Sequence, residues 1–278
     1  MNRILLSCAI LALSFPSLAA TPEVKPVERH IRTLAADDME GRGLGTKGAD
    51  RAAMYIETEL KSAGLKPAFG KSFRQAFPVK TGVSRGEKNA IEGLATDDWT
   101  PLGFSSSGRF DAPIAFVGYG IDADELNYRD YENVDLRGKV ALMLRYEPQE
   151  RDEKSPFDGK KPSRWSAMRY KAMKARERGA VAVVFVTGPL QDEAKDKLPA
   201  LTNDGPESSA GIPIIQVKTS VAQKWIDLAE FQNEVDKNLK PRSRVLEARL
   251  KGNVDVVATF ADAENIAGVN PGRANSAK

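Results

Sequence analysis

His30 is the only histidine in the 278-residue chain, and this limits the chemistry that its side chains could perform. A serine nucleophile would need a histidine-type base, and nothing around His30 in the sequence identifies it as one. Residues 103–108 include three serines, but Ser107 stands where a G-x-S-x-G elbow needs its second glycine. We therefore interpret these serines as part of a turn.

Two glycine-rich segments match dinucleotide-binding loops in their letters. Residues 43–48 fit G-x-G-x-x-G, and residues 118–123 fit the looser G-x-G-x-x-A. A dinucleotide loop follows a strand and opens a helix. The first segment follows a predicted helix and several acidic residues, and no apolar helix pattern follows the second. We favour a tight loop entering a helix for the first and a sharp strand exit for the second, with nucleotide binding as the alternative for each.

Acidic residues occur as neighbouring pairs, which could do acid–base chemistry. The pairs are Asp37/Asp38, Asp97/Asp98, Asp152/Glu153 and Asp192/Glu193. All lie in segments rich in charge, glycine or proline, which favours solvated surface. Calcium is an alternative where Asp122, Asp124 and Glu125 stand near Asp130, although this spacing lacks the glycine and the final glutamate of an EF-hand loop.

The segment 160–178 is strongly basic. It contains eight basic residues and one acidic residue, with aromatic and apolar residues among them. One alternative is a contact face for an anionic polymer or a membrane. We favour a surface helix with solvated lysines and arginines, whose other face packs on a sheet. That buried face would consist of Trp165, Met168, Ala172 and Ala175.

Four short apolar runs predict the strands that would position these residues. They cover residues 114–117, 140–144, 180–186 and 212–217, and each is bounded by turn-forming residues. A predicted helix at 163–178 stands between the second and third runs. Strand, helix and strand at this spacing indicate a β-α-β unit and an α/β fold.

Further elements flank this predicted sheet. Apolar residues at helical spacing predict helices at 27–36 and 49–63, the second followed by Gly64 as its cap. Residues 72–79 read as a strand. A helix begins at Thr219 or Ser220 and ends near Phe231. Residues 245–250 and 254–260 alternate in the manner of two paired strands.

Composition and charge restrict the class of protein. The chain has 41 basic and 38 acidic residues, and a net charge of +3 is too small to indicate a nucleic-acid partner. Residues 1–20 have the basic start, the short apolar core and the small residues of a signal peptide. The one cysteine, Cys8, lies within that segment. We expect a periplasmic or secreted protein, with no membrane contact after signal cleavage.

The segment 113–145 carries a specific pattern of residues. It reads F-V-G-Y-G-I from Phe116 and Y-R-D-Y-E-N-V-D-L-R-G-K-V from Tyr128. This resembles the protease-associated (PA) domain that is inserted in secreted zinc aminopeptidases, in a family that includes glutamate carboxypeptidase and the transferrin receptor. The similarity extends to residues 40–42, 102–105, 107–108 and 265–269.

The resemblance implies a catalytic centre with two zinc ions, two histidines, carboxylates and a glutamate base. Its first ligands form a His-x-Asp motif soon after a segment like residues 265–268. This sequence reaches Lys278 without such a motif, and Ile31 and Arg32 follow its one histidine. We expect the chain to be truncated before the zinc ligands, with zinc only in the absent catalytic domain. No catalytic, metal or other cofactor residue is assigned, and the binding residues stay open.

These inferences define the expected organisation. Residues 1–20 form the signal peptide, 21–80 the N-terminal helical segment, 81–262 the PA domain, and 263–278 the start of the peptidase core with a disordered tail. The fold class is α/β, with a PA-like mixed β-sheet or sandwich and flanking helices, preceded by two N-terminal helices.

The expected function is that of a non-catalytic PA module for protein or peptide interaction, or for control of substrate access. Its partner would be a peptidase catalytic domain or a peptide, not a nucleic acid. The alternative is one half of a split zinc aminopeptidase, whose catalytic domain is a separate chain.

Overall fold

The computed structural model describes residues 24–190, 196–203, 209–270 and 272. Two compact units divide the chain: unit 1 lies within Met1–Ala76 and Glu264–Lys278, and unit 2 is Phe77–Ala263. The predicted signal peptide, the pair Asp192/Glu193 and nearly all of the predicted disordered tail lie outside the described residues.

Unit 1 contains the two predicted helices, α1 (Val24–Leu34) and α2 (Lys47–Ser62). Both helices are confirmed, and each begins two or three residues earlier than predicted. The 3-10 helix η1 (Asp37–Arg42) connects them. Short strands β1 (Lys66–Pro67) and β13 (Gly268–Val269) pair in antiparallel fashion. The hydroxyl of Thr46 accepts a hydrogen bond from Ala49 N at 3.2 Å, which caps α2.

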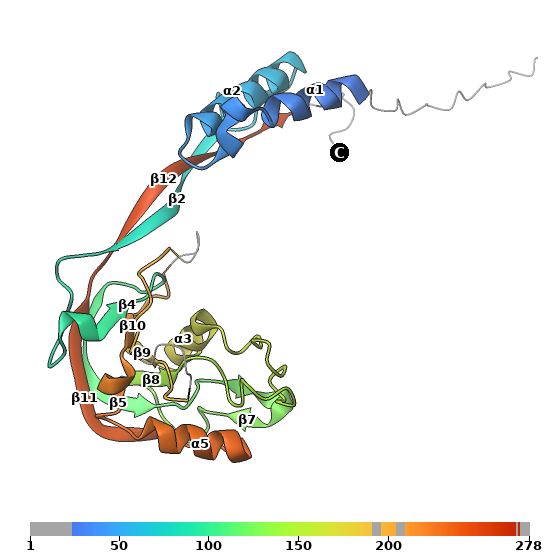
Figure 1. Cartoon of the computed structure of the whole chain (residues 1–278). Coiled ribbons are helices and arrows are strands. Elements are labelled where there is room, and N and C mark those ends of the chain that lie inside the picture. Colours follow the sequence, from blue (N-terminus) through green and yellow to red (C-terminus); the bar gives the residue numbers. More distant parts are fainter. Residues whose placement is uncertain (1–23, 191–195, 204–208, 271, 273–278) are drawn as a thin grey trace, which may run out of the picture. The chain divides into compact units, whose positions relative to one another are not determined.

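Unit 2 is organised around a seven-stranded mixed sheet with the order β3-β11-β5-β8-β9-β10-β4 (Figure 1). Four neighbouring strands, β5, β8, β9 and β10, run parallel, and β11 and β4 flank them in antiparallel fashion. The strand bounds are β3 Ala90–Ile91, β4 Trp99–Pro101, β5 Gly108–Phe116, β8 Val140–Leu144, β9 Ala182–Val186, β10 Ile214–Val217 and β11 Arg244–Val254. The four predicted core strands are therefore confirmed, as is an α/β fold.

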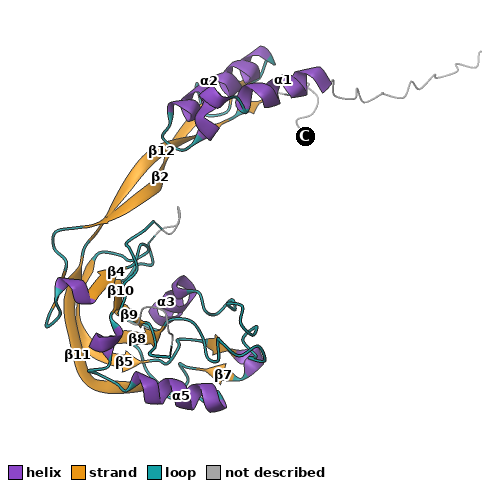
Figure 2. Cartoon of the chain, viewed as in Figure 1, coloured by secondary structure: helices purple, strands orange, loops and turns teal. Residues whose placement is uncertain are grey.

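Apolar side chains cover both faces of this sheet, because successive residues of a strand point to opposite faces. One core cluster includes Phe116, Leu142 and Val184 and packs with Phe231 of α5 (Leu228–Asn238). The other includes Ala115, Ala141 and Val183 and packs with Ala172 and Ala175 of α3 (Met168–Glu177). Figure 2 shows these two helices on opposite sides of the strands of unit 2.

The predicted β-α-β unit is confirmed as β8, α3 and β9, but α3 begins five residues later than predicted. The buried carboxylate of Glu147 causes this difference. It accepts hydrogen bonds from Ser163 N at 2.9 Å and from the Ser163 hydroxyl, and Ser166 N then bonds Ser163 O at 3.2 Å. These contacts hold residues 163–166 in a turn before the helix.

The prediction of one continuous helix from Thr219 or Ser220 to about Phe231 is wrong. The segment forms two helices, α4 (Thr219–Ala222) and α5. Thr219 does not cap α4, because its hydroxyl donates to Thr187 O at 2.8 Å. Asp227 accepts from Glu230 N at 2.9 Å, which starts a separate helix.

The predicted strands 245–250 and 254–260 exist, but the predicted pairing between them is wrong. They belong to β11, which pairs with β5, and to β12 (Val256–Ile266), which pairs with β2 (Arg74–Arg85). Asp255 lies between the two strands and is hydrogen-bonded to the turn that follows β2. Its amide donates to Asn89 Oδ1 at 2.9 Å and its carboxylate accepts from Lys88 N at 3.1 Å.

Short elements complete unit 2. Strands β6 (Asp122–Ala123) and β7 (Tyr128–Arg129) form a small antiparallel pair beyond the end of β5. The 3-10 helices η2 (Thr96–Asp98) and η3 (Asp124–Leu126) precede β4 and β7. The pair β6–β7 brings Asp130 back towards the loop that follows β5.

Candidate functional site

The carboxyl ends of parallel strands meet at one edge of the sheet, and α/β proteins commonly bind ligands at this edge. In unit 2 the loops at this edge follow β5, β8 and β9 at residues 117–121, 145–149 and 187–190. Two charged side chains, Asp130 and Lys171, are fully buried beneath the first two loops.

Asp130 holds the loop after β5 by its backbone. One carboxylate oxygen, Oδ2, accepts from Tyr119 N at 3.1 Å and from Ile121 N at 3.0 Å. The other, Oδ1, accepts from the Tyr128 hydroxyl at 3.0 Å. Gly118 and Gly120 have φ of 56° and 69°, and a Cβ on Gly118 would lie 2.4 Å from Asp130 Oδ1. The prediction of a sharp strand exit at these glycines is confirmed.

Lys171 holds the loop after β8. It lies on α3, and its ammonium donates to Leu144 O at 3.2 Å and to Tyr146 O. Tyr146 adopts a left-handed φ of 61°, which turns its carbonyl out of the strand direction. The ring of Tyr119 lies 5.9 Å from Lys171 Nζ. A lysine is therefore buried here with its charge directed at backbone oxygens.

Burial perturbs the acid–base properties of both groups. It raises the pKa of Asp130 from 3.8 to about 7, against the opposing effect of its hydrogen-bond donors and of Lys171. It lowers the pKa of Lys171 from 10.5 to about 7, against the charges of Asp130 and Glu147. Burial also raises the pKa of the Tyr119, Tyr128 and Tyr131 phenols well above 10, so these phenols stay neutral.

Two crevices open beside these loops. One, of about 230 Å³, is lined by Tyr146, Glu147, Glu150, Lys160, Pro162 and Ser166. The other, of about 420 Å³, is lined by Gln149, Glu150, Arg151, Asp152, Leu190 and Asp236. Asp236 accepts from Gln149 N at 2.9 Å, and partial burial raises the pKa of its carboxyl group. The loop 145–149 thus contributes to both crevices.

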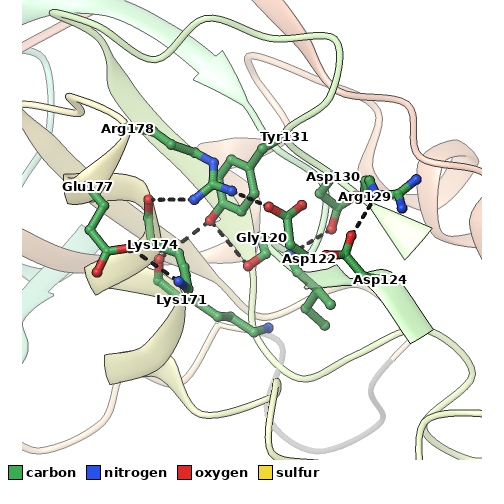
Figure 3. Close-up of polar contacts among 11 residues, drawn as sticks. Gly120, Asp122, Asp124, Arg129, Asp130, Tyr131, Lys171, Lys174, Glu177 and Arg178 are labelled. Carbon is green, nitrogen blue, oxygen red and sulfur yellow. Dashed lines mark hydrogen bonds and ion pairs between the residues drawn. The ribbon is translucent and has the colours of Figure 1, made fainter. Parts of the chain in front are cut away.

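The residues considered for calcium do not converge. Arg178 binds Asp122, Arg129 binds Asp124 at 2.7 Å, and Arg164 binds Glu125. Figure 3 shows Asp122 and Asp124 each beside its arginine. Asp130 instead accepts a hydrogen bond from Ile121 N at 3.0 Å. In the described part of the chain, no three His, Cys, Asp or Glu side chains are grouped so that they could hold a metal ion.

The prediction for the basic segment is confirmed for its exposed members and wrong for Lys171. The exposed members include Lys160, Lys161, Arg164 and Arg176. Arg178 packs over the Tyr131 ring at 4.4 Å. Trp165 is buried before the helix begins and packs on Phe157, so it does not belong to the helix face to which it was assigned.

A signal for the burial of Lys171 was present in the sequence. Lys171 lies three residues after Met168 and four residues before Ala175, on the face that was predicted to pack on the sheet. The charge of Lys171 alone predicts a solvated side chain. Spacing alone would have placed it in the core.

The other sequence candidates have structural roles. The loop 43–48 follows η1 and ends at the helix cap of α2, so the predicted tight loop is confirmed. His30 Nδ1 lies 2.7 Å from the Tyr55 hydroxyl. Ser105 is buried and its hydroxyl accepts from Ile214 N at 2.8 Å, which fits a turn.

The described acidic pairs are on the surface, as predicted. Asp37, Asp38, Asp97, Asp152 and Glu153 are exposed, and Asp98 is half-buried. Glu153 pairs with Lys160 at 2.5 Å. Among the described residues, no helix is long and apolar enough to cross a membrane.

Comparison with known proteins identifies the domain. Residues 108–225 match the PA domain family, which confirms the resemblance to a PA domain, whereas the bounds 81–262 stay a prediction. This segment contains the parallel strands, Asp130 and Lys171. No curated protein matches the sequence.

The solved structures that resemble this chain in part include two aminopeptidases and a peptidase precursor. An aminopeptidase from Aneurinibacillus sp. strain AM-1 has a TM-score of 0.43 and 15% identity, over 85% of this chain and 48% of that one. The zinc aminopeptidase BSAP from Bacillus subtilis has a TM-score of 0.35 and 15% identity, over 86% and 45%. A peptidase M28 precursor from Shewanella amazonensis has a TM-score of 0.33 and 16% identity, over 86% of this chain and 51% of that one. The chain spans about half the length of these proteins.

Proposed function

We propose that this chain is a non-catalytic PA module that works with a zinc aminopeptidase catalytic domain, binding protein or peptide or controlling the access of substrate. The observation that carries the proposal is the PA domain at residues 108–225. The sequence resemblance to PA-containing aminopeptidases, outside as well as inside that segment, supports the choice of partner. The alternative is one half of a split enzyme, in which the catalytic domain is a separate chain.

Zinc belongs to the catalytic partner in this proposal. Zinc enzymes hold their metal with three protein ligands drawn mainly from His, Cys and carboxylates. The single histidine of this chain bonds a tyrosine hydroxyl. Acidic side chains at the carboxyl edge of the sheet bond arginines or backbone amides, so they are already engaged.

The exposed face of α1 supports docking of such a partner. None of the residues of α1 is buried, and Val24, Val27 and Ile31 are 77%, 48% and 62% exposed. On α2, Met54 is 53% exposed. Apolar residues grouped in this way on soluble proteins mark interaction sites. We propose that the catalytic domain covers this face.

The experiment measures metal content, turnover and association separately. The purified chain is dialysed, analysed for zinc, and assayed with leucyl and other aminoacyl chromogenic substrates. We expect no stoichiometric zinc and no turnover. A tightly held zinc per chain, or turnover that a chelator abolishes and further purification does not remove, would contradict the proposal.

Association is then measured with a separately produced zinc aminopeptidase catalytic domain from the same host. We expect binding, and we expect Ile31→Asp to weaken it because a charge would enter the apolar face. Lys25→Asp, which changes charge at an exposed polar position of the same helix, is the matched control. Equal binding by both variants would exclude this face as the docking surface.

Export is part of the same proposal. Mass spectrometry of the protein from its native host should find a mature N-terminus at Ala20 or Thr21. Recovery of the chain with an intact Met1 from the cytoplasm would contradict a periplasmic or secreted location.

A further inference from the structure

A hollow opens near the start of β5, whereas the loops described above follow the carboxyl ends of the strands. It has a volume of about 610 Å³ and lies where the short strand β3 pairs with β11 beside β5. Pockets that hold small ligands commonly have volumes of about 300–1,000 Å³. We name it the β3 hollow, and the residues that line it include Ala90, Glu92, Arg109, Asp111, Lys251 and Asn253.

The strand register places the polar lining of the β3 hollow on one face of the sheet. Asp111 of β5 lies opposite Lys251 of β11, and Arg109 lies opposite Asn253. Successive residues of a strand point to opposite faces, so these side chains share a face. Phe110 points to the other face, where it is buried in the core. The hollow therefore opens over a charged face of the sheet.

The charges at this face are paired, with one exception. Lys251 Nζ lies 3.0 Å from Glu92 Oε2. Arg249, which lines an adjoining hollow of about 440 Å³, directs its Nε to Asp111 Oδ1 at 2.5 Å. Arg109 is exposed, and no described residue forms a hydrogen bond or an ion pair with its side chain. Each carboxylate here thus has a basic partner, and the excess charge is positive.

An unpaired arginine beside a hollow favours an anionic ligand. The guanidinium group is planar and presents a fork of donors, which matches the two oxygens of a carboxylate. The aliphatic stems of Arg109 and Lys251 and the exposed methyl group of Ala90 offer apolar surface next to this charge. A ligand that fits both features has a carboxylate beside a small apolar group.

We propose that the β3 hollow binds a short peptide by a carboxylate group, which Arg109 recognises. The inference rests on the proposed binding of peptide by this module, and it names the place where peptide binds. A water molecule occupies about 30 Å³, so the hollow is far larger than a single small ion requires. A C-terminal carboxylate and an acidic side chain provide the same chemistry, and the experiment distinguishes them.

The experiment is an NMR titration of the isotopically labelled full chain with three capped dipeptides. Acetyl-Ala-Leu carries a terminal carboxylate, acetyl-Ala-Leu amide carries none, and acetyl-Ala-Glu amide carries a side-chain carboxylate. We expect saturable shifts of the Arg109, Lys251 and Asn253 amides with a carboxylate peptide. The uncharged peptide should bind about tenfold more weakly or not at all. Which of the two carboxylate peptides binds decides between a C-terminus and an acidic side chain.

Variants test whether Arg109 is the recognising group. Arg109→Gln should weaken carboxylate binding about tenfold, to the level of the uncharged peptide. This variant should fold as wild type, because the side chain is exposed and has no bonded partner among the described residues. Arg109→Lys keeps the charge without the fork, so its affinity should be intermediate. Arg244→Gln, at the other end of β11, removes another exposed arginine and is the matched control.

Three results would overturn the proposal. They are a lack of saturable shifts at the β3 hollow with both carboxylate peptides, equal binding of the uncharged peptide, and unchanged binding by Arg109→Gln. Saturable shifts confined to another part of the chain would exclude this hollow and leave peptide binding by the module intact. Association with a catalytic domain is measured separately, so failure of this site and failure of the proposed function are distinguishable.

Discussion

Helices α1 and α3 are similar in length and both are amphipathic, yet they are covered very differently. In α1 the apolar residues Val24, Val27 and Ile31 are exposed. In α3 even Lys171 is fully buried, together with Ala172 and Ala175. The sheet of unit 2 covers α3 within this chain, whereas no described residue buries the apolar face of α1. Coverage by a tertiary partner, rather than side-chain polarity, decides which helix face is buried.

The largest expected effect comes from breaking the sheet that covers α3. Val117→Asp or Leu142→Asp places an unpaired charge among fully buried residues. We expect a loss of about 5 kcal/mol or more, comparable with the whole stability of a domain, and therefore unfolding. Val245→Asp on the exposed side of β11 is the control and should fold. Cooperative melting of soluble Val117→Asp would show that this sheet is not the core.

A smaller loss of stability is expected when the buried charge of Lys171 on α3 is removed. Lys171→Met keeps the side-chain volume but leaves Asp130 buried without its compensating charge, at a cost of about 3 kcal/mol. Lys174→Met should change the free energy of unfolding by less than about 0.5 kcal/mol, because its side chain pairs with Glu177 at the surface.

The energetic coupling between Asp130 and Lys171 can be measured with a double variant. In Asp130→Asn/Lys171→Met, neither charge is left alone, so the double variant should lose less stability than the sum of the single variants. Denaturant unfolding of all four proteins gives the coupling energy directly. Additive losses would mean that Asp130 and Lys171 act independently.

The sequence predicted the parallel strands well, because each is a short apolar run between turn-forming residues. Strand β8 was predicted with its observed bounds, Val140–Leu144. These runs are buried on both faces, so local composition contains the whole signal. The α1 and α2 helices were predicted for a similar reason, since their periodicity is local.

Errors arose where contacts between distant residues decide the structure. Helix α3 starts late because Glu147 binds Ser163, sixteen residues further along the chain. The partners of β11 and β12 depend on β5 and β2, which the alternating pattern of 245–260 cannot specify. The candidate site was missed because Asp130 and Lys171, which are forty-one residues apart, come within electrostatic range only after β7 and α3 have packed.

The pH dependence of stability tests the buried charges in opposite directions. The pKa of Asp130 is raised, so the folded chain retains a proton that the unfolded chain has released. Wild type should therefore lose stability relative to Asp130→Asn as pH rises from 3.8 to about 7.

The pKa of Lys171 is lowered, so its contribution has the opposite sign. The folded chain releases this proton more easily than the unfolded chain does. Wild type should therefore gain stability relative to Lys171→Met as pH rises from about 7 to 10.5. Each slope is at most about 1.4 kcal/mol per pH unit, because one proton is involved. If the difference in free energy of unfolding between wild type and each variant does not change with pH, relaxation of the core compensates the charges.

The smallest expected effect lies on the exposed helix. Ile31→Asp should change the free energy of unfolding of the isolated chain by less than about 0.5 kcal/mol, because Ile31 is 62% exposed and the new carboxylate stays in water. The same kind of substitution at Val117 should unfold the domain, which makes the contrast between covered and uncovered residues quantitative. Thermal and denaturant unfolding of the chain alone provides the measurement. A loss of several kcal/mol in Ile31→Asp would mean that the face of α1 is already covered in solution, by a second copy of the chain, and sedimentation of wild type against the variant would then detect that dimer.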